Sequence, residues 1–384
     1  THKKNPVSVR HSEACRSKLG GVAAEGYSMP QLTELGPMWK IFSEIDIRSI
    51  LADAERTPRL ALIGADGKSS AFQGLLQHGP RSAEQLVTAL PCYRLPLQAE
   101  DLAALAGYDL RIVLLDDAQE LRSDSLAPLL AQPAPLLVVL DPWQPGAGAV
   151  DAALGGQTSE LLRVARCALG DEKQVKEELL PALLELLPER ELAIGRAFPG
   201  LRPAVAQKLI ANTSRVNAGY AAGTGLAEMI PGLGIPFAVA DILILTKNQV
   251  VMAYKLGILM GESGTLAEII PKVAGVVGAG FMWRQVAREL VGFLPLGVLL
   301  KTAVAYAGTY ATGQAVYQYF VTGEKLHKQD VKRLFDDALA RGREIAADTV
   351  EQVKGKREPA LLEASVDRPA KKKRKLSLAK RRPV

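Results

Sequence analysis

The sequence is poor in the residues that build metal centres, disulfide frameworks and catalytic triads. Its 384 residues include three cysteines and four histidines, and none of them forms a CxxC or HExxH pattern. They are Cys15, Cys92, Cys167, His2, His11, His78 and His327. An odd number of widely spaced cysteines argues against a disulfide framework and indicates a reducing compartment. Zinc and triad chemistry lack their usual residues, and residues 1–20 have no apolar segment of the kind that marks a signal peptide.

The net positive charge is confined to the C-terminal segment. Between residues 354 and 384 there are twelve Lys or Arg and three acids, a balance of +9, so the remaining residues carry −3 of the net +6. A basic tail, not a basic domain, accounts for the charge, which argues against a nucleic-acid interface on the folded part. With 48% hydrophobic and 23% charged residues the chain is neither disordered nor fibrous, and its length predicts two or three units.

Long alternating runs are absent from the first half, but three short apolar runs occur there. They are Arg59–Gly64 (RLALIG), Leu110–Leu115 (LRIVLL) and Leu136–Leu140 (LLVVL). Nearly continuous apolar runs of this length are typical of parallel strands that are covered on both faces. Helical patterns lie between them, at Ser70–His78 and Leu121–Ala131. This alternation predicts an α/β domain with a parallel sheet over residues 46–192, preceded by a mobile arm at 1–45.

The second half has a different character. Small and aliphatic residues dominate residues 193–325, and strand-like runs give way to long helical patterns. An all-α hydrophobic domain is expected there. An amphipathic helix is expected over 326–354, because apolar residues recur with helical spacing from Val331 to Val353. Residues 355–384 are predicted to be a disordered basic tail.

One short motif could bind a nucleotide. Ile63–Ser70 (IGADGKSS) follows the first apolar run and begins a helical pattern, which is the context of a phosphate-binding loop. In such a loop Gly67, Lys68 and Ser69 would contact the phosphates, with Lys68 neutralising them and Ser69 holding Mg²⁺. However, two residues separate Gly64 from Gly67 where the motif has four, and Asp66 adds a negative charge. The motif is either a residual nucleotide site for GTP and Mg²⁺, or a plain turn from which that site has been lost.

The order of motifs resembles an Era-like bacterial GTPase domain over about residues 56–192. The resemblance rests on GKSS followed by Ala71–Leu76 (AFQGLL), on Asp109–Asp117 (DLRIVLLDD), on Leu136–Gln144 (LLVVLDPWQ) and on Ala165–Leu169 (ARCAL). In that family the last two positions hold the guanine-reading NKxD and SA motifs. The resemblance therefore implies a P-loop GTPase-like parallel sheet.

The sequence departs from this family where catalysis and base reading would occur. The NKxD position reads Leu140–Gln144 (LDPWQ), and no DxxG lies between Arg81 and Gly107. Without these residues neither the base contact nor the water-positioning switch can be named. Asp116 and Asp117 would either imitate a metal-binding acidic pair or cap the next helix. The domain is interpreted as a degenerate, pseudo-GTPase domain with no assigned catalytic residue.

Residues 205–325 resemble a bacterial helical domain of unknown function that is commonly fused behind Era-like GTPase domains. The resemblance rests on Leu209–Ala218 (LIANTSRVNA), on Ile230–Pro236 (IPGLGIP) with Asp241, on Asn248–Tyr254 (NQVVMAY) and on Gly261. Met260 replaces a tyrosine that is usual in that family. The family is membrane-associated, so the resemblance implies a membrane partner.

Two segments in this half are candidates for membrane spans. Ile230–Thr246 has 17 residues with one charge, Asp241, and Thr302–Gly323 has 22 residues with none, against the about 20 apolar residues that a span requires. Thr302–Gly323 also has alanines at 303, 307, 311 and 315, a stripe that allows close helix approach. Such stripes occur in soluble bundles too, and a hydrophobic soluble bundle remains the alternative.

The C-terminal tail has two basic clusters, Lys371–Lys375 and Lys380–Arg382. They would reinforce contact with an anionic leaflet, although a nuclear-localisation run or a merely solvated tail has the same pattern. We expect a membrane-associated pseudo-GTPase or scaffold without turnover, at the bacterial inner membrane or its cytoplasmic face, with an unknown protein partner. The alternatives are an active GTP-binding switch that controls the helical domain, a cytoplasmic location, and a nucleic-acid binder acting through residues 370–382. Specific base recognition is disfavoured because no aromatic residues interleave the tail.

Overall fold

The structure is a computed structural model that describes residues 45–80, 90–115, 127–140, 160–228, 237–273 and 297–366. Contacts divide the chain into two units, Thr1–Ile45 and Asp46–Val384. All the elements below belong to the second unit, so the sheet and the long helices lie within one compact body. Of the arm expected at residues 1–45, residues 1–44 lie outside the described residues.

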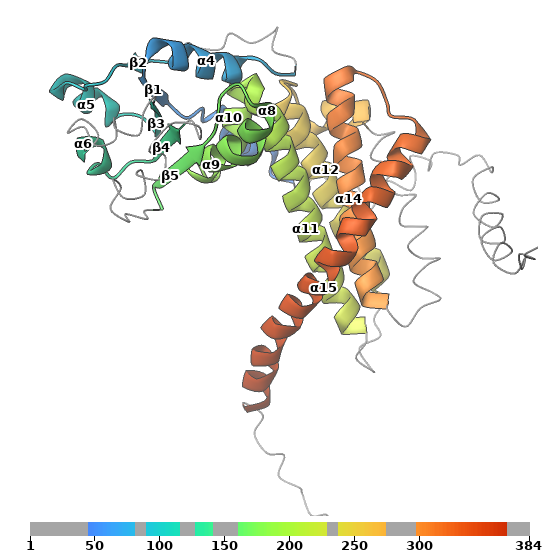
Figure 1. Cartoon of the computed structure of the whole chain (residues 1–384). Helices are drawn as coiled ribbons and strands as arrows, with labels where there is room; N and C mark the ends of the chain where they lie inside the picture. Colours follow the sequence, from blue (N-terminus) through green and yellow to red (C-terminus); the bar gives the residue numbers. More distant parts are fainter. Residues whose placement is uncertain are drawn as a thin grey trace, which may run out of the picture. The chain divides into compact units, whose positions relative to one another are not determined.

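A parallel sheet forms the first half of this unit (Figure 1). Its strands are β1 (Leu60–Gly64), β2 (Cys92–Tyr93), β3 (Leu110–Leu115), β4 (Leu136–Leu140) and β5 (Leu162–Arg166). They are hydrogen-bonded in the order β2-β1-β3-β4-β5, and every neighbouring pair is parallel. The α/β prediction and the three predicted strands are confirmed.

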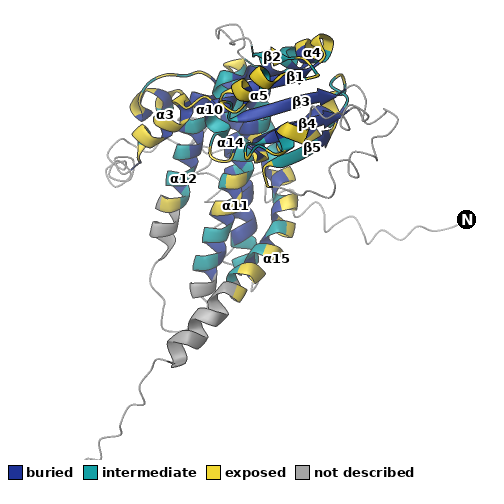
Figure 2. Ribbon diagram, turned by 90° about the vertical axis from the view of Figure 1, so that its left-hand side faces the viewer, coloured by how far each residue is buried: buried dark blue, intermediate teal, exposed yellow. Residues whose placement is uncertain are grey.

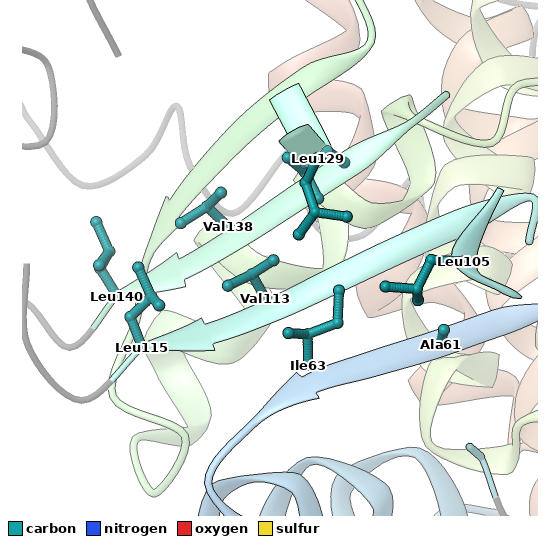
Figure 3. Packing of buried hydrophobic residues seen from close by; sticks show 9 residues of the cluster. Ala61, Ile63, Leu105, Val113, Leu115, Leu129, Val138 and Leu140 are labelled. Atoms are coloured by element: carbon teal, nitrogen blue, oxygen red, sulfur yellow. The ribbon is translucent and has the colours of Figure 1, made fainter. Parts of the chain in front are cut away.

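The apolar runs form strands because both faces of the sheet are covered. On one face Ile63, Val113 and Val138 are in register, and Leu105 and Leu129 from two covering helices point toward them (Figure 3). The intervening residues of β1, β3 and β4 are buried too, as the dark blue of β3 in Figure 2 illustrates. Polar and apolar residues alternate in a strand that has one face in solvent. Both faces of these strands are covered, which is why their apolar runs are nearly continuous.

Short helices precede, connect and follow the strands. They are α3 (Ile47–Glu55), α4 (Asp66–Gln77), α5 (Ala99–Leu105), α6 (Ala127–Leu130), α8 (Glu172–Gln174), the π-helical η4 (Val175–Leu179), α9 (Leu180–Glu185), α10 (Glu191–Ala197) and the 3-10 turn η5 (Pro199–Leu201). From α8 to α9 the backbone stays helical through Pro181, because the Leu180 N–H reaches back to the Val175 carbonyl and opens a wider turn in front of the proline. Residues 121–126 of the helix expected at 121–131 lie outside the described part.

Four long helices form the second half: α11 (Arg202–Glu228), α12 (Phe237–Leu259), α14 (Gly297–Thr322) and α15 (Lys328–Val366). Residues 266–273 are helical as well. Helices α11, α12, α14 and α15 lie side by side as a bundle (Figures 1 and 2). The predicted helical region behind the α/β sheet is confirmed.

Helix α14 contains the candidate span Thr302–Gly323 except for its last residue. Its alanine stripe faces other helices: Ala307 and Ala311 share a buried cluster with Phe335 and Ala338 of α15. Among the described residues, no helix is both long enough and apolar enough to cross a bilayer. The other candidate, Ile230–Thr246, lies partly outside the described residues.

Helix α15 covers the residues for which an amphipathic helix was expected. Its apolar face buries Phe335, Ala338, Ala346 and Val350. The helix ends at Val366, so the boundary expected at 355 falls inside the helix. The strong helix formers at 360–364 (ALLEA) favour helical backbone beyond that boundary. Residues 367–384 of the basic tail lie outside the described part.

Candidate functional site

The strand order defines where a ligand would bind in this fold. The chain leaves β1 for β2 on one side and returns to β3 on the other, so the connections diverge between β1 and β3. In open α/β sheets, ligands bind beyond the carboxyl ends of the strands at such a point. Here those ends are Gly64 and Leu115, and the turn that contains Gly67, Lys68 and Ser69 follows Gly64 directly.

The turn is too short to wrap a phosphate. Only Ala65 separates the end of β1 from the start of α4. Gly64 has a φ of +152°, and a Cβ there would lie 2.4 Å from the Leu114 carbonyl oxygen, so glycine is required. The backbone enters the helix at once, since the Ser69 N–H already donates to the Ala65 carbonyl at 2.9 Å. The turn is therefore too short to form a loop whose backbone N–H groups could encircle a phosphate.

Lys68 is directed toward β3. Its Nζ donates to the carbonyl oxygen of Leu115 at 2.5 Å, across the point where the connections diverge. Leu115 is the last residue of β3, and its carbonyl continues the row of strand carbonyls at this end of the sheet. The ammonium group is thus held against a backbone oxygen of the chain itself, at the place where a phosphate oxygen would be its partner.

Asp66 supplies a negative charge at the N-terminus of α4. Its carboxylate accepts two hydrogen bonds from Arg94, one from Nε at 2.8 Å and one from Nη2. The hydrogen bonds and charge of Asp66 raise the pKa of Arg94 above its usual value. Both side chains are well exposed, so the pair contributes little to stability. Its effect is local: a helix N-terminus attracts anions, and Asp66 adds a negative charge of the chain itself to that first turn.

Ser69 does not suit the magnesium role implied by the resemblance. Its side chain is buried, with 2% of its surface exposed, and its Oγ has no hydrogen-bond partner in the described part of the chain. Mg²⁺ keeps several waters and needs octahedral oxygen ligands, which a hydroxyl enclosed in this way cannot share with solvent. No cluster of three metal-ligating side chains occurs within the described ranges either. No metal-dependent step can be derived from these residues.

The expected base-reading positions are placed only in part. Asp116, Asp117 and residues 141–144 lie outside the described residues. Of Ala165–Leu169, β5 contains the first two residues, and Cys167 is buried with its N–H on the Leu140 carbonyl at 2.7 Å. The next N–H, that of Ala168, donates to Gln174 Oε1 at 2.9 Å. A backbone amide that the resemblance would assign to guanine is thus satisfied by a nearby side chain.

Sequence reasoning missed the groups that close this site. Arg94 follows β2, a strand of two residues that leaves no periodic pattern. The partner of Lys68 is a backbone carbonyl 47 residues away, and a carbonyl has no signature in the sequence at all. Asp66 was the one residue whose sequence position indicated a problem for nucleotide binding, because an acidic side chain in a phosphate-binding turn repels the phosphate.

A second cluster of polar side chains lies in the bundle. Asn217 of α11 donates to Thr309 Oγ1 of α14 at 2.8 Å and accepts from Asn248 of α12 at 2.7 Å. Gln249 of α12 donates to the same Thr309 oxygen at 3.2 Å. Asn217, Gln249 and Thr309 are buried. The residues that carried the second resemblance therefore join three helices, a structural role that every hydrogen bond in the cluster supports.

Comparisons with known proteins add no relative to this description. No family model, no curated protein and no solved structure matches the chain. The GTPase-like and helical-domain resemblances therefore stay at the level of the motifs quoted above, and function has to be argued from the site itself.

Proposed function

We propose that this protein is a non-catalytic scaffold whose α/β half is a pseudo-GTPase domain with a self-occupied phosphate turn. The observation that carries the proposal is the pairing of Lys68 with the Leu115 carbonyl. In a working nucleotide site this lysine is the principal cation for the phosphates. Here it crosses the ligand position and binds the end of β3.

Four further features support the same proposal. The Asp66 carboxylate, held by Arg94, places a negative charge at the helix N-terminus that would receive phosphate. The one-residue turn lacks the amides for a phosphate cradle. Ser69 is enclosed, and Gln174 takes the Ala168 amide. A nucleotide would have to displace several satisfied contacts and overcome one repulsive charge before gaining any of its own.

Nucleotide titration tests this proposal. Calorimetry with the full chain, Mg²⁺ and GTP, GDP or ATP should give no saturable heat at millimolar nucleotide. Lys68→Ala serves as the matched variant and should behave in the same way. Micromolar, guanine-selective binding that disappears in Lys68→Ala would refute the pseudo-GTPase proposal. It would instead favour the active switch, with the helix bundle as its responding part.

For the membrane, we propose peripheral attachment through the basic tail. The clusters Lys371–Lys375 and Lys380–Arg382 contain eight cations and no acid, and each basic residue near an anionic leaflet contributes about 1 kcal/mol. The α14 side chains that give Thr302–Gly323 its apolar character are largely engaged with other helices of the bundle. The tail therefore supports attachment without requiring this helix to leave the bundle.

Vesicle sedimentation separates this attachment from its alternatives. The full chain should sediment with phosphatidylserine vesicles at low salt and be released at high salt, because charge attraction is screened. A chain ending at Val366 should stay in solution under both conditions. Binding that resists high salt and survives the truncation would mean that an apolar segment inserts. Equal binding to neutral vesicles would also contradict the charge-based proposal.

A further inference from the structure

The turn after α4 and the turn before α11 touch through two glycines. A Cβ at Gly79 would lie 2.0 Å from the Pro199 carbonyl oxygen, and a Cβ at Gly200 would lie 1.9 Å from the Leu75 carbonyl oxygen. Each glycine thus lies directly against backbone of the opposite segment. Contacts of this kind allow no side chain between the two segments, and they fix the end of α4 against η5.

Arg202 ties the same corner together. Its side chain is fully buried, and it donates to the carbonyl oxygens of Pro80 at 2.6 Å, Gly195 at 3.3 Å and Arg196 at 3.3 Å. Pro80 lies just beyond the end of α4, and Gly195 and Arg196 are in the last turn of α10. The last carbonyls of a helix lack partners within the helix and carry partial negative charge, so one guanidinium binds the end of α10 and also the segment that follows α4.

Helix α4 connects this corner to the ligand position of the sheet. At its first turn lie Asp66 and Lys68, which are bound to Arg94 and to the end of β3. Twelve residues, about 18 Å, further on it ends at the glycine contact. Between the two ends, Phe72 and Leu76 are buried, so the helix is held along its length.

The other side of the corner is equally tight. A Cβ at Gly195 would lie 2.5 Å from Leu259 of α12 and 3.0 Å from Val205 of α11. Helix α10 is therefore pressed against two helices of the bundle at the point where it receives Arg202. The sheet and the bundle also fall within one contact unit.

We propose that Arg202 and the Gly79–Gly200 contact form a rigid joint through which α4 transmits any displacement at the carboxyl ends of β1 and β3 to α11. The inference holds whether or not a nucleotide binds, because it concerns the connection and not the ligand. It assigns a positioning role to Arg202, a residue that lies far from the candidate site. The sheet and the bundle would then move together as one rigid body.

Arg111 provides a matched control. It is as buried as Arg202 and donates to the Leu129 carbonyl at 3.2 Å, to Gln132 Oε1 at 2.7 Å and to the Ala134 carbonyl. All of these acceptors belong to α6 or to the connection between α6 and β4, inside the α/β half. Arg111→Met removes a comparable buried guanidinium without touching the joint.

Hydrogen exchange of the full chain, read by mass spectrometry, tests the joint. In Arg202→Met, amides of residues 70–80 and of residues 193–206 should both exchange about tenfold faster, since several carbonyls lose a buried charged donor. In Arg111→Met, residues 127–136 should become faster while residues 193–206 stay at the wild-type rate. The proposal fails when Arg202→Met loosens only one of its two segments, or when Arg111→Met loosens residues 193–206 equally.

A second pair of variants tests transmission without relying on a large packing defect. Asp66→Asn weakens the exposed pair with Arg94 at the far end of α4, and it should change exchange at residues 66–72 and also at 199–206. Arg202→Lys keeps the charge but loses the three-way fork of the guanidinium. Combined with Arg202→Lys, Asp66→Asn should still affect residues 66–72 and should no longer affect 199–206. A response at 199–206 that persists in this background, or one that never occurs in the wild-type background, would overturn the proposal.

Discussion

In the sheet, neighbouring elements are joined by backbone hydrogen bonds, whereas the described helices of the bundle are joined through side chains and through glycines that allow close approach. Strands β1, β3 and β4 pair residue by residue, and apart from Arg111 of β3 their side chains are apolar and fill the space. A helix satisfies its own backbone, so nothing in its backbone specifies how a neighbouring helix is aligned. The bundle obtains that alignment from Asn217, Thr309 and closely packed glycines.

The comparison predicts different sensitivities. The sheet should respond mainly to lost volume, and the bundle to lost polar partners and to added volume at glycines. Four substitutions test this, and all are measured as changes in the free energy of unfolding in urea on the full chain.

The largest effect is expected for Leu137→Ala in β4. Leu137 is fully buried between β3 and β5, and truncating such a leucine leaves a cavity that costs about 4 kcal/mol. Leu137→Met conserves the volume and should cost less than about 1.5 kcal/mol. Equal costs for the two variants would mean that shape, not volume, is what the sheet requires.

Asn217→Ala should follow, with a loss of about 3 kcal/mol. It removes one of the two amide donors to the buried Thr309 hydroxyl and the acceptor of the half-buried Asn248 amide, and in the interior a lost partner costs more than the net strength of the bond itself. Asn212, on the same helix but exposed, is the control, and Asn212→Ala should change stability by less than about 0.5 kcal/mol. A neutral Asn217→Ala would show that the polar cluster does not hold the helices together.

Gly313→Ala should cost about 2 kcal/mol, because its Cβ would lie 2.8 Å from Ile210 of α11 and 3.0 Å from Met252 of α12. The same change at Gly219 of α11 meets nothing within 4 Å and should stabilise the helix by about 1 kcal/mol. Opposite signs for two identical substitutions would sharpen the comparison. A stabilising Gly313→Ala would show that the bundle relaxes easily around added volume.

The smallest effect is expected for Ser69→Ala, and it should be stabilising by about 1 kcal/mol. The Ser69 hydroxyl is buried without a described hydrogen-bond partner. Removing it takes away a desolvation cost that no hydrogen bond offsets. Ser70→Ala, at an exposed neighbouring position, is the control and should be close to neutral. A clear loss of stability in Ser69→Ala would show that the hydroxyl has a partner after all.

The elements that could be predicted are those whose evidence is local. Apolar runs of five or six residues identified β1, β3 and β4, and helical spacing identified α4 and the long helices. Strand β2 was missed because two residues carry no period, and its place beside β1 is set by pairing with Leu62 and Ile63. The sequence predicts a helical segment at Leu179–Leu192 that is interrupted by Pro181 and Pro188, but the backbone stays helical through Pro181, because the wider turn that accommodates this proline depends on a backbone hydrogen bond.

The candidate site was predictable only as a list of residues. Gly67, Lys68 and Ser69 were identified from their spacing and their place after a strand. Their surroundings were not, since the contact of Lys68 with Leu115 and that of Asp66 with Arg94 join residues 47 and 28 positions apart. Arg202 gave no signal, although it is among the largest fully buried side chains.

The sequence by itself determined the class of each half and the shortness of the phosphate turn, because hydrophobic periodicity and residue spacing are properties of neighbouring residues. The tertiary structure alone decided the environment of each chemical group. It directed Lys68 to a strand end, enclosed Ser69, and surrounded the apolar α14 with other helices. Hydropathy measures how apolar a segment is, but it does not show which other parts of the chain cover that segment. The partner of a charged group is likewise determined by how distant parts of the chain pack together.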